Sequence, residues 1–271
     1  MSRYIKNPPI TNMKNAFSVK GLNVLVTGGN SGIGRGIVQA FVESGANIAV
    51  HALDIEDAKQ TVDDINQYGG RNIAISCDVT DYDGVKRIKE EVFTSFDHLD
   101  VLVNNAGVGG KKHFMGEEGL DDWHRVINTN LHGTANMIHE FAGSMCEAGI
   151  GGSIINISSI GGQAIGDARN HPNAPYNASK AALDHFTHYL CVLFGDYGIR
   201  INNIAPGPTH SDLEKDLPPS ILESIEDGMP LHRFGEPIEI GALAVFLASP
   251  AGCHITGTVS VHDGGILVTG M

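Results

Sequence analysis

The feature that most constrains this chain is a regular alternation of short apolar runs with longer amphipathic segments. The runs share the length and β-branched content of buried strands, and they cover residues 23–26, 47–50, 72–76, 101–103, 153–157, 200–204 and 259–261. After the first run, Ile33, Ile37 and Phe41 recur at helical spacing. Strands that alternate with helices predict right-handed crossovers and a parallel sheet covered on both faces. We therefore expect an α/β fold with a doubly wound parallel sheet.

Three segments depart from this short-period alternation. Residues 1–20 contain two adjacent prolines and are predicted to form an irregular N-terminal arm before a single domain, residues 21–271. The region of about 206–231 contains five prolines and is predicted to be a loop-and-helix region beside the ligand site. Residues 123–145 predict one long helix. Ligands of doubly wound sheets bind outside the carboxyl ends of the strands, so functional residues are expected there.

Composition excludes several kinds of partner. The formal net charge of −13 argues against nucleic acid, because binding to phosphate backbones depends on Lys and Arg. No segment has the run of ~20 apolar residues that a membrane helix needs, and the N-terminus lacks the apolar core of a signal peptide. The sequence therefore predicts a cytoplasmic, soluble protein without nucleic-acid or membrane partners.

Cysteines and histidines give no metal or disulfide signal. The four cysteines lie far apart in the sequence, at Cys77, Cys146, Cys191 and Cys253. They are expected to be free thiols, as in a reducing compartment. His185 and His188 are three residues apart on a predicted helix, but no ligand set with recognised zinc spacing accompanies them. No metal site is predicted.

A glycine-rich turn, Thr27–Gly34, follows the first predicted strand. Its glycines Gly28, Gly32 and Gly34 are spaced G-x-x-x-G-x-G. Glycine permits unusual dihedral angles, lets a pyrophosphate approach the backbone and lets the next helix pack against the sheet. The helix N-terminus offers free N–H groups and the positive end of its dipole to phosphate. Such a turn is often only a tight turn, but its place after the first strand favours dinucleotide binding.

Tyr176 and Lys180 are four residues apart at the start of a predicted helix, so they share one helix face. An isolated tyrosine has a pKa near ~10, and a nearby ammonium group favours the phenolate and lowers that pKa. A tyrosine tuned in this way can exchange a proton with a carbonyl or alcohol oxygen while hydride moves at the adjacent carbon. Taken alone, this spacing is most often an exposed pair on a helix.

Further motifs in a fixed order make the chain similar to the short-chain dehydrogenase/reductase family over Gly21–Gly265. Besides the glycine turn and the Tyr176–Lys180 pair, they are Asp78-Val79, Asn104–Gly107, Asn128–Leu131, Asn156–Ser159, Arg200–Asn202, Pro206-Gly207, Arg233–Pro237 and Asp263–Gly265. The resemblance implies a single-domain Rossmann fold and an enzyme that interconverts a secondary alcohol and a ketone with a nicotinamide cofactor.

The resemblance also implies roles for individual residues. Tyr176 would be the general acid/base, and Lys180 would bind the nicotinamide ribose and lower the pKa of Tyr176. Ser159 would hydrogen-bond the reacting oxygen, and Asn130 would hold a water that links Lys180 to solvent. The residues implied to contact the cofactor are Gly28, Asn30, Ser31, Gly32, Ile33, Gly34, Asp78, Val79, Asn105, Ala106, Gly107, Tyr176, Lys180, Pro206 and Gly207.

Two features of the sequence before Tyr176 bear on the active site: a pair of adjacent serines and a lengthened segment. Ser158 and Ser159 are adjacent, and side-chain alternation lets only one of them face the site; the family pattern favours Ser159. The approach to Tyr176 is also longer than the family pattern, by a stretch around Gly166–Asn173. That stretch either shapes substrate specificity or bulges into solvent, and the sequence does not decide between them.

The end of the second predicted strand bears on the choice between NAD and NADP. An acidic residue there binds the ribose 2′-hydroxyl of NAD, whereas an arginine accommodates the 2′-phosphate of NADP. Ala52 and Leu53 occupy the two informative positions, and Asp54 is the charged residue beside them. Asp54 would repel a 2′-phosphate and joins the candidate cofactor-binding residues. NAD is favoured, although His51 leaves NADP possible.

The sequence predicts the type of reaction more narrowly than it predicts the substrate. Residues 17–21 resemble family members that act on sugar acids and polyols. Reduction of 3-oxoacyl groups on an acidic carrier protein is disfavoured by the acidic chain, and hydroxysteroids remain possible. A non-catalytic dinucleotide-binding redox sensor is the alternative from another class. The family also implies a homo-oligomer, a tetramer or dimer.

Overall fold

The computed structural model describes residues 7–165, 173–211 and 218–269. This part of the chain contains a seven-stranded sheet in which all neighbouring strands are parallel. In sheet order the strands are β3 (Asn72–Ser76), β2 (Asn47–Ala52), β1 (Asn23–Thr27), β4 (Val101–Asn104), β5 (Gly152–Ile157), β6 (Ile199–Pro206) and β7 (Val259–His262). The strand order reverses between β1 and β4, which confirms the predicted doubly wound sheet.

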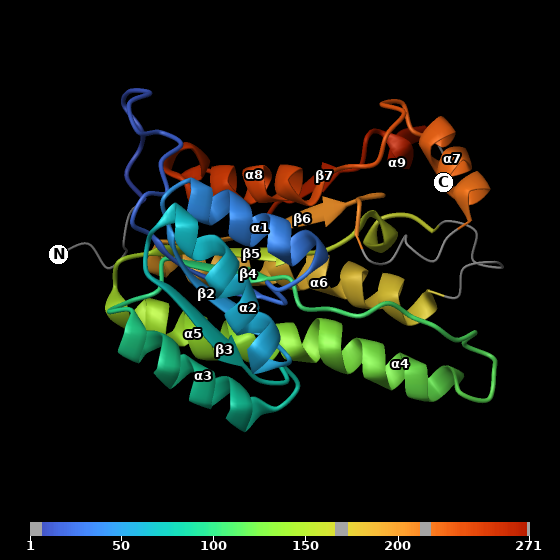
Figure 1. Cartoon of the computed structure of the whole chain (residues 1–271), viewed down its shortest axis with the longest axis horizontal. Helices are drawn as coiled ribbons and strands as arrows, with labels where there is room; N and C mark the ends of the chain where they lie inside the picture. The colour runs from blue at the N-terminus through green and yellow to red at the C-terminus, as the bar shows by residue number, and fades with distance from the viewer. Residues whose placement is uncertain (1–6, 166–172, 212–217, 270–271) are drawn as a thin grey trace.

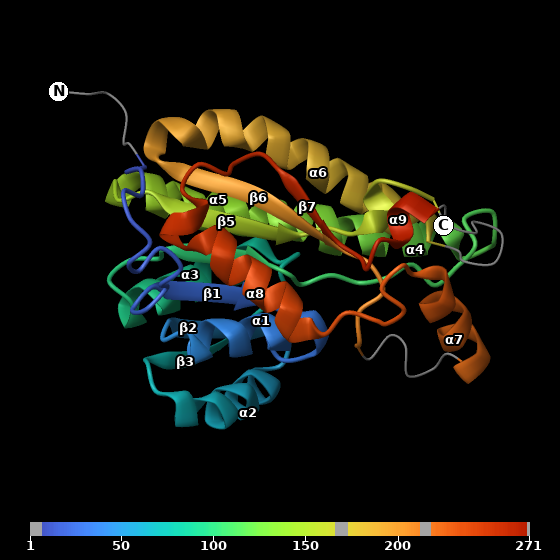
Figure 2. The same ribbon diagram turned by 90° about the horizontal axis from the view of Figure 1, so that it is seen from above.

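Helices cover both faces of this sheet, as Figures 1 and 2 show. One face carries α1 (Gly32–Glu43), α2 (Ile55–Ile65) and α8 (Pro237–Ala248). The other face carries α3 (Tyr82–Ser95), α5 (Thr134–Ala148) and α6 (Ala174–Phe194). Helix α7 (Pro219–Gly228) and the short α9 (Ile266–Thr269) lie beyond the carboxyl ends of the strands. The two layers leave that end of the sheet for the functional residues.

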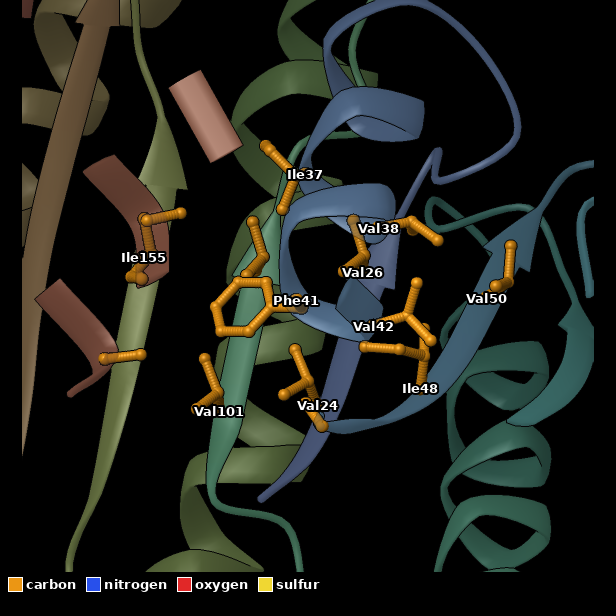
Figure 3. Packing of buried hydrophobic residues seen from close by; sticks show 14 of the residues in the cluster. Val24, Val26, Ile37, Val38, Phe41, Val42, Ile48, Val50, Val101 and Ile155 are labelled. Atoms are coloured by element: carbon orange, nitrogen blue, oxygen red, sulfur yellow. The ribbon is translucent and has the colours of Figure 1, made fainter. Parts of the chain in front are cut away.

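Side-chain alternation along the strands divides the core between the two helix layers. Val24 and Val26 of β1 pack with Ile37 and Phe41 of α1 (Figure 3). Leu25 points to the opposite face, into the cluster formed with α3, α5 and α6. Both faces of every central strand are therefore buried, which explains why the strands appear in the sequence as continuous apolar runs rather than alternating ones.

The long helix predicted over residues 123–145 is interrupted. Helix α4 (Gly119–Ile127) and α5 are joined by a π-helical turn, Asn128–Gly133. The hydroxyl of Thr134 donates to the carbonyl oxygen of Asn130 within this turn (2.9 Å). A π-helical turn inserts one extra residue and is frequent at functional sites. Here it turns the side chain of Asn130 inward, where it is 1% exposed.

Glycines allow α1 and α8 to approach closely. A Cβ atom on Gly36 would clash with Pro237, at the start of α8. On the facing helix, a Cβ atom on Gly241 would lie 2.6 Å from Ala40 Cβ and Gly36 O. Because α1 begins at the glycine-rich turn, this contact fixes the position of that turn relative to the sheet.

The described part of the predicted N-terminal arm packs onto the domain. Val19 is fully buried in the core, and the carbonyl of Ala16 accepts a hydrogen bond from Ala251 N (2.7 Å). The rings of Phe17 and Phe246 are 6.2 Å apart. Residues 1–6 lie outside the described residues. Among the helices of the described ranges, none is long and apolar enough to cross a membrane.

Candidate active site

The glycine turn and the Asn104–Gly107 segment are tied together at the switch in strand order. Thr27 ends β1, and its hydroxyl oxygen accepts hydrogen bonds from the backbone N–H of Asn105 (2.9 Å) and Ala106 (3.0 Å). In return, Asn105 Nδ2 donates to the carbonyl oxygens of Thr27 and Gly28, both at 3.0 Å. These four contacts hold the ends of β1 and β4 in one rigid unit.

The backbone of the glycine turn is one that residues with side chains rarely adopt. Gly28 and Gly32 have φ angles of 60° and 48°, in the left-handed region that favours glycine. A Cβ atom on Gly34 would clash with the carbonyl oxygen of Gly28. Ser31 is the N-cap of α1, but its side chain makes no capping hydrogen bond, so the first-turn N–H groups remain available for an anion.

His51 of β2 supports this turn, a role that the sequence did not reveal. Its Nδ1 accepts a hydrogen bond from Gly28 N (3.4 Å), and its Nε2 lies 3.1 Å from the carbonyl oxygen of Cys77. These partners require a neutral ring with the proton on Nε2. Burial lowers the pKa of His51 to about 4, which keeps the ring neutral. The expectation that His51 could face a 2′-phosphate is therefore wrong.

The end of β2 presents negative rather than positive charge. Ala52 is buried, whereas Leu53 is 75% exposed. Asp54 is the N-cap of α2, and its carboxylate accepts a hydrogen bond from Glu56 N (2.7 Å). Asn30 of the glycine turn donates to Asp57 of the same helix (3.4 Å).

Arg35, the basic residue on the first helix, is turned away from the glycine turn. Its guanidinium donates to Asp64 (3.0 Å) and to the carbonyl oxygen of Thr61 (3.2 Å), both on α2. This residue therefore joins α1 to α2.

Asp78 and Val79 follow β3, beside the same edge of the sheet. The carboxylate of Asp78 accepts hydrogen bonds from the backbone N–H and the hydroxyl of Thr80, both at 2.8 Å. The side chain of Val79 is buried, 2.6 Å from where a Cβ atom on Gly133 would lie. Its carbonyl accepts from Asn136 Nδ2 (3.0 Å). Hydrogen bonds and packing therefore hold Asp78 and Val79, the residues for which the family resemblance implies cofactor contact.

Asn130 connects the cofactor side of the site to α6. Its Oδ1 accepts a hydrogen bond from Val108 N (2.8 Å), and its Nδ2 donates to Val108 O (2.9 Å) and Ser179 Oγ (3.1 Å). Both amide protons are thus used. A water held by Asn130, as the family resemblance implies, would need an oxygen acceptor of this residue rather than the side-chain N–H group.

Ser158 and Ser159 point to different partners, as the alternation of side chains along a strand requires. The hydroxyl of Ser158 donates to the carbonyl oxygen of Lys180 (3.4 Å) and is buried behind the site. The hydroxyl of Ser159 accepts a hydrogen bond from Gly161 N (3.1 Å), and its interaction with Tyr176 lowers the pKa of that phenol. The structure therefore brings Ser159, and not Ser158, to Tyr176.

Tyr176 and Lys180 lie on one face of α6, close to the end of β5. Lys180 Nζ is 5.5 Å from the centre of the Tyr176 ring and donates to the carbonyl oxygen of Ile157 (2.7 Å). Burial lowers the pKa of Lys180 to about 8. Burial raises the pKa of Tyr176 and the Ser159 hydrogen bond lowers it, with burial the larger effect. The expected lowering of the Tyr176 pKa by Lys180 is thus not the dominant effect in this structure.

Pro206 and Gly207 close the site at the end of β6. Pro206 pairs in register with His262 of β7, and Gly207 N donates to the His262 carbonyl (2.9 Å). A Cβ atom on Gly207 would lie 2.6 Å from Asp263 Cβ. Residues 166–172 of the lengthened approach to Tyr176, and residues 212–217 of the predicted substrate loop, lie outside the described residues. Helix α7, from the same loop region, has no buried residue.

The family model described as enoyl-(acyl carrier protein) reductase matches residues 28–267. Among curated proteins, glucose 1-dehydrogenase 2 of Bacillus subtilis is 32% identical over 249 residues, covering 91% of this chain and 95% of that protein. A 3-oxoacyl-[acyl-carrier-protein] reductase of Staphylococcus aureus is 38% identical over 244 residues, covering 89% of this chain and 97% of its own. The 7α-hydroxysteroid dehydrogenase of Escherichia coli is 31% identical, covering 89% and 92%.

Solved structures agree over nearly the whole chain. A short-chain dehydrogenase/reductase from Mycobacterium marinum has a TM-score of 0.87 at 31% identity, covering 93% of this chain and 98% of its own. A gluconate 5-dehydrogenase from Burkholderia cenocepacia in complex with NADP and tartrate has a TM-score of 0.87 at 29% identity, covering 94% and 98%. The chain therefore belongs to the short-chain dehydrogenase/reductase family and is an NAD(P)-dependent oxidoreductase that acts on CH–OH groups.

Proposed function

We propose that this enzyme interconverts a secondary alcohol and a ketone of a sugar acid, polyol or similar small carbonyl compound, with Tyr176 as the general acid/base. The proposal rests on the observation that the side chains of Ser159, Tyr176 and Lys180 lie close together in one site. Ser159 interacts with the Tyr176 phenol and lowers its pKa, and Lys180 Nζ is 5.5 Å from the centre of the Tyr176 ring. A dinucleotide-binding sensor has no physical need for this arrangement, so the non-catalytic alternative is disfavoured.

The residues of the glycine turn fit a nicotinamide dinucleotide. Gly28 and Gly32 have positive φ angles, a Cβ atom on Gly34 would clash with Gly28 O, and the start of α1 offers uncapped N–H groups. When bound, the nicotinamide would supply or accept the hydride. Asn105, Ala106 and Gly107 would line the floor of its site, and Lys180 would hold the nicotinamide ribose.

The proton chemistry follows from the surroundings of Tyr176. Because burial raises its pKa, the phenol holds its proton in this structure and is suited to donate to a carbonyl oxygen during reduction. Ser159 would hold the same oxygen by a hydrogen bond. In the oxidative direction, the Ser159 hydrogen bond and the Lys180 charge both favour the phenolate that would accept the alcohol proton.

We propose NAD as the preferred cofactor. Asp54 and Asp57 place two carboxylates near the end of β2 and the glycine turn, where a 2′-phosphate would add negative charge. Arg35 is engaged by Asp64, and His51 is neutral and buried. Among relatives, 7α-hydroxysteroid dehydrogenase was solved with NADH and gluconate 5-dehydrogenase with NADP, so both cofactors occur on this fold.

Two other substrate classes remain candidates within the same chemistry. Identity of 38% to a 3-oxoacyl-[acyl-carrier-protein] reductase favours 3-oxoacyl groups, and 31% identity to 7α-hydroxysteroid dehydrogenase favours hydroxysteroids. The net charge of −13 still argues against docking of an acidic carrier protein, since like charges repel. The similarity to glucose 1-dehydrogenase and to gluconate 5-dehydrogenase supports the sugar-type substrate.

We also propose that the protein is a homo-oligomer, a dimer or tetramer. Helix α6 exposes Tyr189, Val192 and Leu193, which are 63%, 74% and 48% exposed. Large apolar side chains gathered on one helix are typical of an association surface. Light scattering coupled to size-exclusion chromatography measures the mass directly, and a purely monomeric mass would contradict the proposal.

A substrate panel tests the proposed function. Sugar acids, polyols, hydroxysteroids and β-keto esters are each assayed with NAD(H) and NADP(H), by the absorbance of the reduced nicotinamide. The expected result is turnover of a sugar acid or polyol with NAD. Tyr176→Phe should abolish turnover while leaving cofactor binding nearly unchanged, because the ring remains and only the proton donor is lost. Unchanged turnover in this variant would rule out the proposed mechanism.

A further inference from the structure

Three asparagines form a hydrogen-bonded row across the middle of the sheet. Asn104 of β4, Asn156 of β5 and Asn203 of β6 occupy paired register positions. Asn104 Nδ2 donates to Asn156 Oδ1 (2.8 Å), and Asn156 Nδ2 donates to Asn203 Oδ1 (3.1 Å). Asn156 and Asn203 are completely buried, and Asn104 is 3% exposed. We call these three residues the asparagine row.

The asparagine row ends on a buried carboxylate of α6. Asn203 Nδ2 donates to Asp184 Oδ1 (2.7 Å), and Thr187 Oγ1 donates to Asn203 Oδ1 (2.7 Å). Asp184 is only 8% exposed. Within the described ranges it forms no ion pair with any Lys, Arg or His. A buried carboxylate held only by a neutral amide is costly unless a positive charge lies near it.

The positive charge one helical turn away is Lys180. Residues four apart lie on the same face of a helix, so Lys180 and Asp184 are neighbours along α6. Lys180 is itself 4% exposed, and the one hydrogen bond formed by its Nζ is to a neutral carbonyl, Ile157 O. Among the described residues, each of the two buried charges therefore lacks a direct ion-pair partner and has the other as its nearest compensating charge on the helix.

We propose that Asp184 is a positioning residue of the active site: the asparagine row fixes its carboxylate, and the carboxylate keeps Lys180 protonated at working pH. This inference deepens the proposed function, because it rests on Lys180 acting as a cation beside Tyr176. The row crosses the sheet from Asn104, which precedes the proposed cofactor residues Asn105–Gly107, to Asp184 on α6.

The electrostatics of Lys180 agree with this arrangement. Burial lowers the pKa of Lys180 to about 8, and the charge of Asp184 opposes that lowering. The titratable group that shares its helix face is Tyr176, whose phenol is neutral at this pH. Among the described residues, the groups of β5, β6 and the π-helical turn that hydrogen-bond to this part of α6 are neutral: Ile157 O, Ser158, Asn203 and Asn130. Asp184 is thus the charged group that sustains the ammonium form.

The test compares Asp184→Asn with Thr187→Val. The first variant keeps an oxygen acceptor for Asn203 and removes the charge, whereas the second removes a hydroxyl from the same network and leaves every charge. The Lys180 ammonium is titrated directly by NMR of protein labelled with 15N-lysine, and its signal is assigned by its absence in Lys180→Met. This readout needs no turnover, so it distinguishes failure of this inference from failure of the proposed function.

In Asp184→Asn, the midpoint of the Lys180 titration should fall by on the order of one pH unit. If wild type loses turnover or dinucleotide binding at alkaline pH, Asp184→Asn should lose it at a lower pH, by the same shift as its Lys180 midpoint. Thr187→Val should lower the melting temperature without moving either midpoint. An unchanged Lys180 titration in folded Asp184→Asn would overturn the inference and leave Asp184 with a purely structural role, whatever the activity of the wild type.

Discussion

The imidazole of His51 accepts a hydrogen bond from the backbone N–H of Gly28, at 3.4 Å between Nδ1 and N. The same ring reaches the carbonyl oxygen of Cys77 through Nε2 (3.1 Å). One buried side chain of β2 thus holds both the first residue of the phosphate turn and the end of β3. The geometry of the cofactor site depends on strand β2 as well as on the glycine motif.

His51→Leu should weaken both the fold and cofactor binding. The variant leaves Gly28 N and the Cys77 carbonyl without their partner, which should lower the free energy of unfolding by about 1–3 kcal/mol. The KM for the dinucleotide should rise more than kcat falls, because the chemical groups are untouched. Urea unfolding and steady-state kinetics measure both quantities. His254→Leu, at an exposed histidine, serves as the control and should change neither.

His51 also predicts a pH dependence of stability. Its pKa is lowered from 6.5 to about 4 in the folded protein, so between these values the unfolded state binds more protons. The contribution of the neutral ring is full above pH 6.5 and is lost as the pH falls towards 4. Wild type should therefore lose more stability than His51→Leu over this range. Parallel acid-side slopes in urea titrations of the two proteins would contradict the assignment.

Gly34→Ala and Gly36→Ala should fail in different ways. A Cβ atom on Gly34 would clash with Gly28 O inside the turn, whereas one on Gly36 would clash with Pro237 across the α1–α8 contact. Both should destabilise the fold by about 1–3 kcal/mol or more, as overpacking does. Gly34→Ala should in addition abolish dinucleotide binding, measured by calorimetry. Gly143→Ala, at a helical glycine with open space around it, should be tolerated.

Replacing each of the two adjacent serines separates their roles. Ser159→Ala removes the hydroxyl bonded to Tyr176 and should lower kcat by about a hundredfold or more, as loss of a hydrogen bond to a reacting oxygen does. Ser158→Ala removes a long, weak hydrogen bond to Lys180 O and should lower kcat far less than Ser159→Ala does. Kinetics with the best substrate of the panel measure both. Equal losses in the two variants would mean that position 159 has no special role.

The Arg233–Glu239 pair at the start of α8 predicts a second stability effect. Glu239 accepts from Glu236 N (2.7 Å) and from Arg233 (2.6 and 2.9 Å), and the Arg233 hydrogen bond is the main reason that its pKa is lowered to about 2. Glu239→Gln keeps the cap but loses the charge attraction. Since Arg233 is largely exposed, the expected loss is only about 0.5–1 kcal/mol.

That loss has a defined pH window. A carboxylate with a depressed pKa contributes stability above its unfolded pKa of 4.5, and the contribution disappears as the pH falls through about 2. Thermal unfolding of wild type and Glu239→Gln should therefore differ at neutral pH and converge near pH 2. A difference that stays constant down to pH 2 would mean that the charge does not act as described.

The sequence determined the order and type of the elements, because strand and helix formation follow from local periodicity. The apolar runs became β1 to β7, and the amphipathic segments became the helices of the two layers. It also determined the family, since the glycine turn, Asn104–Gly107 and the Tyr176–Lys180 pair keep a fixed order along the chain. The clash that a Cβ atom on Gly34 would make and the positive φ angle of Gly28 show why the glycine turn needs glycine.

Only the tertiary structure decided how residues far apart in sequence act on one another. Gly133, the last residue of the π-helical turn, packs closely against Val79, 54 positions away by residue number. The neutral state of His51 depends on its burial between two strand ends, and the asparagine row depends on strand register. Such contacts join residues that are far apart in the chain, so they produce no recognisable short-range pattern in the sequence. The family motifs thus placed Tyr176 and Lys180 together, but the surroundings that set their proton affinity came from the fold.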